Sequence, residues 1–173
     1  MRYWLDATDR LAEVDEAWRA FATENGAPEL ASPAILGRPM ASFCTDSTTA
    51  EIWAQLFARS RSGDSVELEV RCDAPELRRL FLVTLTANEA GLVQARSELL
   101  SAEPRARVEL LEAHRPHSDE LLVCCSWCKR WQAPAGAWVE VEALCAQLQL
   151  LGQPILPAVS HGICGDCRSR FAR

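Results

Sequence analysis

The most constraining feature of the chain is two pairs of cysteines, each pair separated by two residues. They are Cys125 with Cys128 and Cys164 with Cys167, and 35 residues lie between the pairs. A spacing of two residues lets one tight turn direct both sulfurs to a single point. Four thiolates at one point are a ligand set that zinc prefers, in tetrahedral geometry. The sequence therefore predicts a structural zinc site made by these four residues.

The other four of the eight cysteines are predicted to be bystanders. Cys124 adjoins a proposed ligand, and neighbouring side chains on an extended strand point to opposite faces. Cys145 lies in a helical pattern and is expected to be buried. Cys44 and Cys72 are expected to be buried structural thiols, because free cysteine is among the most buried residue types.

Three other chemistries remain open for the paired cysteines. Lys129 and Arg130 favour thiolates, which suits reversible disulfides and a labile, redox-sensitive zinc. An iron–sulfur cluster also takes four cysteines. Permanent disulfides rank last, because the chain shows no export signal. His161, three residues before Cys164, is an alternative ligand, but a hydrogen bond to a ligand or a helix cap is the expected role.

The residues between the pairs predict a hairpin followed by a helix. Trp131 and Trp138 flank a turn, and apolar residues then recur at helical spacing over residues 141–151. The second pair opens a short helix at residues 168–171. A cysteine pair at a turn, with another at a helix start, is similar to the treble-clef zinc fold.

The first hundred residues predict an α+β domain. Asp15 is a good N-cap for one helix, and Thr48 with Glu51 forms a capping box before a second. The order of elements is two strands, helices and three sequential strands, which one antiparallel sheet with helices on one face satisfies. The strand patterns lie at residues 3–8, 11–14, 66–72, 80–85 and 93–99.

Specific residues in this region resemble the PAS sensor family. The segment 14–22 looks like the family's second strand running into its first helix. Residues 35–39, Ile-Leu-Gly-Arg-Pro, look like its turn before a helix. The resemblance covers residues 3–101. It implies a sensory domain that holds a flavin, a haem, another small ligand or nothing, and that often dimerises. The pocket residues are unknown. Trp4, Trp18 and Trp53 fit an ordinary core better than a pocket.

The cysteine-rich tail closely resembles a tail found in bacterial signalling proteins, where it follows PAS domains or response regulators. The resemblance rests on residues 125–130, Cys-Ser-Trp-Cys-Lys-Arg, on Trp138, and on residues 160–167, Ser-His-Gly-Ile-Cys-Gly-Asp-Cys. It covers residues 123–171. It implies an architecture with the four cysteines as ligands, and it does not imply a particular reaction.

A polar stretch with a proline, residues 114–119, predicts a linker between the two parts. We therefore divide the chain into a PAS-like domain, residues 1–117, and a zinc-binding module, residues 118–173. Residues 119–173 hold five acids and five bases, so the net charge of −6 belongs entirely to residues 1–118. An acidic chain argues against general nucleic-acid binding. No apolar run reaches the length of a membrane span, and a cytoplasmic location is expected.

Three arginines form a basic patch in this acidic region. Arg71, Arg78 and Arg79 suit a carboxylate or phosphate ligand, but pairing with Glu67 and Glu69 is the expected outcome.

No catalytic constellation is evident, and four cysteines leave a zinc ion no open position for chemistry. The sequence thus predicts a non-enzymatic signalling or regulatory protein with a PAS-like sensory domain and a structural zinc module. Protein partners or a homodimer are expected. A thiol-based redox sensor and a zinc-dependent nucleic-acid-binding regulator are the alternatives.

Overall fold

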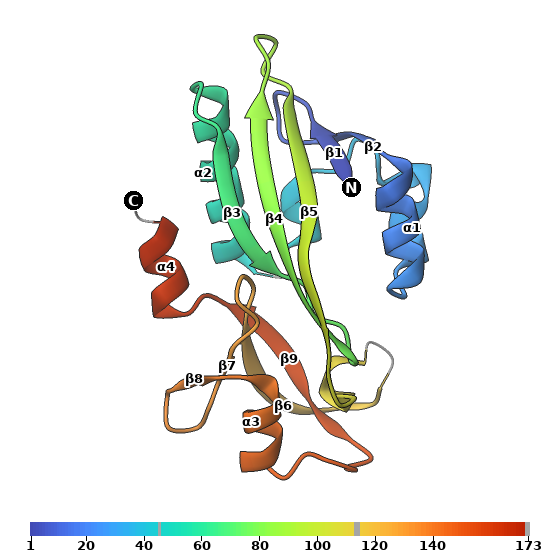
Figure 1. Ribbon diagram of the computed structural model, residues 1–173, viewed down its shortest axis with the longest axis vertical. Helices are drawn as coiled ribbons and strands as arrows, with labels where there is room; N and C mark the ends of the chain where they lie inside the picture. Colours follow the sequence, from blue (N-terminus) through green and yellow to red (C-terminus); the bar gives the residue numbers. More distant parts are fainter. Residues whose placement is uncertain (45, 113–114, 172–173) are drawn as a thin grey trace. The chain divides into compact units, whose positions relative to one another are not determined.

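The structure is a computed structural model that describes residues 1–44, 46–112 and 115–171. It belongs to the α+β class, as predicted, with two β-sheets and four α-helices in those residues (Figure 1). The chain forms two compact units. The first unit is Met1–Glu69 with Phe81–Leu100, and the second is Val70–Leu80 with Ser101–Arg173.

A five-stranded sheet, in the order β2-β1-β5-β4-β3, provides the first unit's strands. β1 pairs antiparallel with both β2 and β5. The β3–β4 and β4–β5 connections are only a few residues long, so these strands are antiparallel as well. The strands are β1 (Arg2–Leu5), β2 (Leu11–Val14), β3 (Val66–Arg71), β4 (Leu77–Ala87) and β5 (Val93–Pro104).

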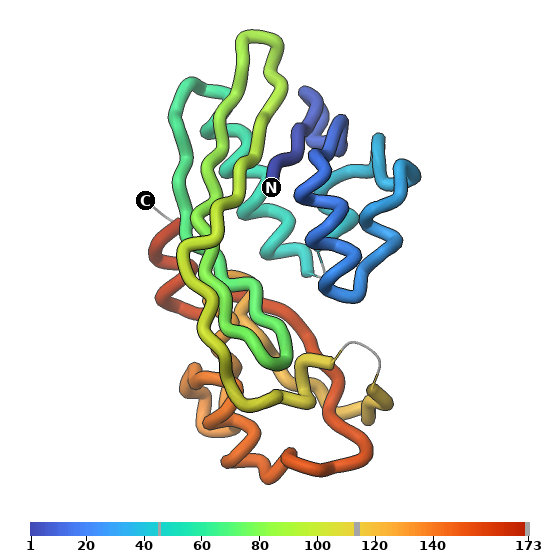
Figure 2. Tube along the Cα trace, turned by 45° about the vertical axis from the view of Figure 1, so that its right-hand side comes forward, coloured from blue at the N-terminus to red at the C-terminus, as the bar shows by residue number. Residues whose placement is uncertain are grey.

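Two helices, α1 (Glu16–Glu24) and α2 (Ser47–Arg61), lie on the same side of strands β3–β5 (Figure 2). The rings of Phe21 on α1 and Phe81 on β4 meet edge to face, with their centroids 5.8 Å apart. Phe57 on α2 is 1% exposed. The first unit's apolar core therefore lies between the helices and one face of the sheet.

The two helix starts test the predicted caps. Asp15 caps α1 as expected, and its carboxylate accepts a hydrogen bond from the Trp18 amide at 2.8 Å. The predicted capping box at Thr48 is wrong, because α2 begins at Ser47, two residues earlier than a cap at Thr48 implies. Asp46 is the cap, and it accepts hydrogen bonds from the amide and the hydroxyl of Thr49 at 2.8 and 2.7 Å.

Short 3₁₀ helices occupy Pro28–Ala31, Pro33–Ile35 and Met40–Phe43. The turn between the last two is held against β2. The Gly37 amide donates to the Leu11 carbonyl at 2.7 Å, and the Leu11 amide donates to the Arg38 carbonyl at 2.9 Å. Gly37 has φ +79°, a conformation that suits glycine.

The three tryptophans weighed as pocket residues have different surroundings. Trp18 packs edge-on against the Tyr3 ring at 5.2 Å. Trp53 stacks on Phe57 with ring centroids 5.6 Å apart. Trp4 lines a surface depression of about 230 Å³ that also involves Asn88. Trp18 and Trp53 thus have the aromatic neighbours of core residues.

The second unit contains a four-stranded sheet in the order β8-β7-β6-β9. β6 and β9 run parallel, from His117 opposite Leu156 to Cys125 opposite Gly162, with a register shift between Ser118 and Leu121. The predicted hairpin is present as β7 and β8. The elements are β6 (His117–Cys125), β7 (Trp131–Gln132), β8 (Trp138–Val139), α3 (Val141–Gln147), β9 (Leu156–Gly162) and α4 (Gly165–Phe171), with a 3₁₀ turn at Glu109–Leu111.

The apolar core of this unit surrounds Trp131 and Leu144, which are 1% and 0% exposed. Cys124 and Cys145 belong to the same cluster, and Val108 and Leu110 join it from the segment before β6. The full set of buried members is Val108, Leu110, Cys124, Trp131, Ala133, Val141, Leu144, Cys145 and Leu156.

Two sequence predictions for this region need correction. α3 ends at Gln147 rather than at residue 151, because Gln149 turns into the left-handed region with φ +54°. The predicted linker overlaps β6, which begins at His117, while its first residue, 114, lies outside the described residues. The second unit draws residues from both sides of position 117. The functional division at that position stays a prediction.

Asp73, in the β3–β4 turn, is the centre of a set of ion pairs in the second unit. Its side chain is 3% exposed. The Arg71 guanidinium binds its carboxylate, and Arg105 donates to it from Nη1 at 3.2 Å. Both arginine side chains are largely buried, at 13% and 7% exposure. Asp73 therefore compensates two buried positive charges.

These two arginines, together with Arg78, bind two acids at the start of α3. Arg71 donates to both oxygens of Glu140 at 2.9 and 2.8 Å. Arg78 and Arg105 donate to Glu142 at 3.1 and 3.4 Å. We call these five residues, together with Asp73, the arginine–carboxylate network. Sequence analysis missed these partners of the basic patch, because they lie more than 60 residues away.

None of the helices in the described residues combines the length and the hydrophobicity that a membrane crossing requires.

Candidate metal centre

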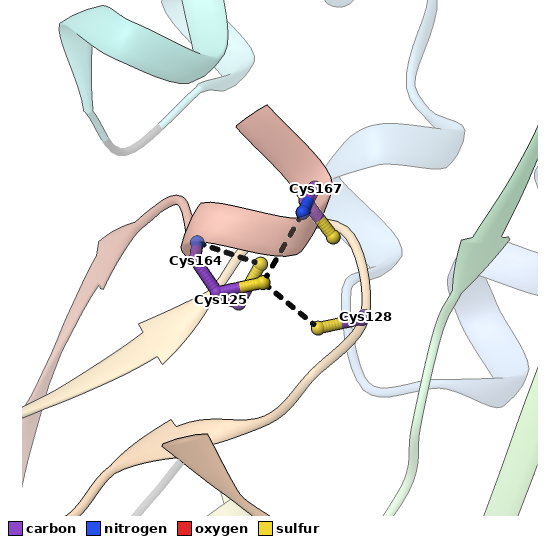
Figure 3. A group of neighbouring side chains, drawn as sticks. All are labelled: Cys125, Cys128, Cys164 and Cys167. Carbon is purple, nitrogen blue, oxygen red and sulfur yellow. Dashed lines mark hydrogen bonds between the residues drawn. The ribbon is translucent and has the colours of Figure 1, made fainter. Parts of the chain in front are cut away.

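The four cysteines of the two pairs converge in the second unit (Figure 3). Their Sγ atoms all lie within 4.8 Å of one another. The Sγ atoms of Cys128 and Cys164 are 3.7 Å apart. Zinc–sulfur bonds of about 2.3 Å in a tetrahedron place neighbouring sulfurs about 3.8 Å apart. The four thiols are free, and their spacing matches a single tetrahedral ion.

The first pair lies in the turn between β6 and β7. The Cys125 amide donates to the Arg130 carbonyl at 2.7 Å, and the Lys129 amide donates to the Cys125 carbonyl at 3.0 Å. Lys129 has φ +55°, which reverses the chain within this short segment. The turn places Cys128 beside Cys125, as the spacing of two residues predicts.

The second pair lies where β9 passes into α4. The Cys164 amide donates to the Cys125 sulfur at 3.5 Å, and the Cys167 amide donates to the Cys164 sulfur at 3.4 Å. The predicted short helix is present and carries Cys167. The parallel pairing of β6 with β9 brings the two turns together, because both turns follow the same end of the sheet.

Burial differs among the four cysteines. Cys125, Cys164 and Cys167 are 0%, 1% and 3% exposed, whereas Cys128 is partly exposed. The ring of Trp127, between the first two cysteines, packs on Phe171 of α4 with centroids 4.4 Å apart. Solvent therefore reaches the group mainly at Cys128.

Arg130 lies at this accessible side. Its Nε donates to the Cys128 sulfur at 3.4 Å, and its Nη2 donates to the Cys164 sulfur at 3.7 Å. Nη2 also binds the Asp166 carboxylate at 2.6 Å. Sequence analysis named Arg130 but missed its partner Asp166. A base directly after the first cysteine pair and an acid inside the second pair were a usable signal that the two could meet.

The surroundings shift the thiol pKa values of three of these cysteines in different directions. Hydrogen bonds from Cys125 and Cys167, together with Arg130, lower the pKa of Cys128 well below its ordinary value. Hydrogen bonds to Cys125 and Cys128 and burial raise the pKa of Cys167, and burial raises the pKa of Cys164.

The remaining cysteines lie outside this group. Cys124 lies outside the group, as predicted, and belongs to the apolar core, where burial raises the pKa of its thiol to about 12. Cys145 is buried on α3, as predicted. Cys44 and Cys72 are partly exposed, so the prediction of buried thiols was wrong for both. Cys44 follows a 3₁₀ helix and Cys72 follows the last residue of β3, where the packed faces end.

His161 pairs with Cys124 across β6 and β9, at a register position that faces away from Cys125. The metal-compatible group contains the four cysteines and does not include it. A role in supporting a ligand stays a prediction.

No protein-family model, curated protein or solved structure matches this chain. The chemistry of the donor set is therefore the evidence for the site. Four sulfur donors at tetrahedral spacing are typical of zinc or iron, and they leave no position for a substrate.

Proposed function

We propose that Cys125, Cys128, Cys164 and Cys167 bind one zinc ion, and that the ion is structural. The observation that carries the proposal is the spacing of the four sulfurs within 4.8 Å, with three of the four side chains buried. Zinc neutralises thiolate charge that burial otherwise disfavours. In small modules of this kind the free energy of metal binding contributes directly to the free energy of folding.

Metal analysis of the purified chain, combined with a count of reactive thiols, tests the proposal. We expect one zinc per chain, and four further thiols that become reactive when a chelator is added. Cys125→Ser and Cys164→Ser should each abolish stoichiometric zinc and lower the melting temperature. Cys72→Ser is the matched control, because Cys72 lies outside the group, and it should leave both unchanged. Intact zinc content in the first two variants would refute the site.

The spacing also bears on the iron–sulfur alternative. A multinuclear cluster places iron and sulfide atoms between the thiolates, and so requires wider separation than one ion does. A spacing of 3.7 Å between Cys128 and Cys164 favours a single ion. Visible absorption of the purified protein would instead support iron.

A redox-sensitive zinc is the second candidate, and the partial exposure of Cys128 favours it. An oxidant such as hydrogen peroxide would meet this thiolate first. Stoichiometric zinc release at low peroxide, reversed by a thiol reductant and zinc, would support a sensor. Retention of zinc in the presence of peroxide would argue against a sensor and leave a purely structural role for the ion.

For the whole chain we propose a non-enzymatic, cytoplasmic signalling protein of bacterial type, with a PAS-like sensory domain and a treble-clef-like zinc module. The support is the resemblance of the two segments, the order of elements in β1–β5, and the turn at Gly37 held to β2. Native mass spectrometry of the protein as purified tests this directly. A retained small ligand or a homodimer would support it.

Nucleic-acid binding through the tail is less well supported. Arg130 already binds Asp166, and the chain carries a net charge of −6. Salt-dependent binding to mixed DNA or RNA at submicromolar protein would revive this alternative.

A further inference from the structure

The side chains of Arg130 and Asp166 bridge the two cysteine turns. Arg130 follows the first pair, and Asp166 lies within the second. One nitrogen, Nη2, serves both Asp166 and the Cys164 sulfur, while Nε serves the Cys128 sulfur. The guanidinium therefore joins one sulfur of each pair and is itself anchored by a carboxylate from α4.

This position coincides with the exposed side of the sulfur group. Cys128 is the partly exposed member, and the Arg130 side chain beside it is 30% exposed. A competing ligand that approaches Cys128 from solvent meets this guanidinium. The Asp166 side chain is 77% exposed, so its bond to Arg130 holds the guanidinium from the outer side.

Charge gives the contact a further effect. Four thiolates around one divalent cation leave an excess of negative charge on the sulfurs. An arginine is always protonated, and its planar fork can donate to two sulfurs at once. Hydrogen bonds from a cation stabilise such thiolates more than a neutral donor does.

We propose that Arg130, held by Asp166, is a positioning residue that controls how tightly the site retains its metal and how fast a competing ligand displaces it. The inference rests on the zinc site proposed above. Neither residue is a metal ligand. Their removal should therefore weaken binding without changing the stoichiometry.

The experiment uses the zinc-loaded full chain and an excess of the chromogenic chelator 4-(2-pyridylazo)resorcinol. Both the equilibrium competition and the rate of zinc transfer are recorded for wild type, Arg130→Ala, Arg130→Lys and Asp166→Asn. Arg168→Ala is the matched control, since it removes a positive charge from α4 next to Cys167. Circular dichroism of each zinc-loaded variant reports whether it is folded.

We expect Arg130→Ala to bind one zinc about 10- to 100-fold more weakly, as is typical when a partner of a metal ligand is lost. Zinc transfer should be correspondingly faster. Arg130→Lys should fall in between, because an ammonium does not reproduce the fork. Asp166→Asn keeps the guanidinium but loses its anchor, so it should show a smaller loss in the same direction. Arg168→Ala should resemble wild type.

Equal losses in Arg130→Ala and Arg168→Ala would overturn the inference, because net charge alone would then explain them. Unchanged affinity and rate in Arg130→Ala would also overturn it. If Arg130→Ala does not fold, wild-type zinc affinity and transfer rate in both Arg130→Lys and Asp166→Asn would likewise overturn the inference. These results leave the zinc site standing, whereas a wild-type chain that binds no zinc would refute both proposals.

Discussion

Arg71 donates to both carboxylate oxygens of Glu140, at 2.9 and 2.8 Å, although 69 residues separate them in the chain. Glu140 is the residue that precedes α3. The end of β3 therefore binds the start of α3, the helix that packs against the β6–β9 sheet. With Asp73, Arg78, Arg105 and Glu142, this contact makes the β3–β4 turn part of the second unit.

Asp73 is the residue of the arginine–carboxylate network whose loss should cost most. Asp73→Ala leaves the buried side chains of Arg71 and Arg105 with less compensating charge, and removing one partner of a buried ion pair costs about 3 kcal/mol. Urea denaturation of the zinc-loaded protein should show this decrease in unfolding free energy. Glu76→Ala is the control, because the Glu76 side chain forms an exposed ion pair with Arg107, and its loss should change stability by about 0.5 kcal/mol or less. Similar losses in both variants would contradict the buried role of Asp73.

A fragment of residues 118–173 should bind zinc more weakly than the full chain, even though it holds all four cysteines. It lacks Val108 and Leu110 of the apolar core and Arg105 of the network. A fragment of residues 101–173 restores these three and should recover part of the affinity. Zinc competition assays and circular dichroism compare the three proteins. Equal affinity in the shortest fragment would show that the module is complete without the earlier segments.

The bystander cysteines should react with a thiol reagent in an order set by exposure and pKa. In the folded, zinc-loaded chain at pH 8, the partly exposed Cys72 and Cys44 should react before the buried Cys124 and Cys145. Burial raises the pKa of the Cys44 thiol and so slows its reaction by reducing its thiolate fraction. Cys124 and Cys145 should react only on unfolding. Labelling followed by mass spectrometry assigns each site, and early modification of Cys124 would contradict its burial.

The Cys124 thiol also predicts a loss of stability in alkali. Burial raises its pKa from 9.0 to about 12 in the folded protein. A group whose folded pKa is raised contributes its full stability below its unfolded pKa. That contribution is lost as the pH rises from 9.0 toward 12. Cys124→Ala should flatten the fall in melting temperature over that range, and an unchanged slope would assign the effect to other groups.

Gly37→Ala should destabilise the first unit by about 1 kcal/mol, because an added Cβ disfavours the left-handed conformation. The same change at Gly165, a helical position of α4 with open space around it, should have the opposite sign, by about 0.5 kcal/mol. Thermal or urea denaturation checks both. A neutral Gly37→Ala would mean that the turn can adopt another conformation.

The sequence predicted the features that local patterns encode. Alternating residues marked β4 and β5, Asp15 marked the start of α1, and the cysteine spacing marked the metal centre. The start of α2 was wrong, because Asp46 and Thr48 both fit a cap and the carboxylate prevailed. A residue pattern shows which residues can cap a helix, but it does not compare the free energies of two caps that lie two residues apart.

The contacts that sequence analysis missed are long-range. Nothing in residues 117–125 and 156–162 indicates that they pair as parallel strands, because alternation reveals a strand and not its partner. The same holds for Arg71 and Asp166, whose charge was visible while their partners were not. The group of four cysteines was predictable, and the residues that hold and surround it were less so.

The pairing of β6 with β9 sets the distance between the sulfurs of the two cysteine pairs. Both strands lead directly into a cysteine turn, so the separation of Cys125 and Cys164 depends on strand alignment and not on the length of the segment that connects them. Natural variants could lengthen the surface turn around Gly152 freely. Loss of a single residue inside β9 would shift every later side chain to the other face of the sheet. Chain length is therefore free to vary at the turn around Gly152, whereas a change of one residue in β9 would break up the group of four cysteines that could hold a metal ion.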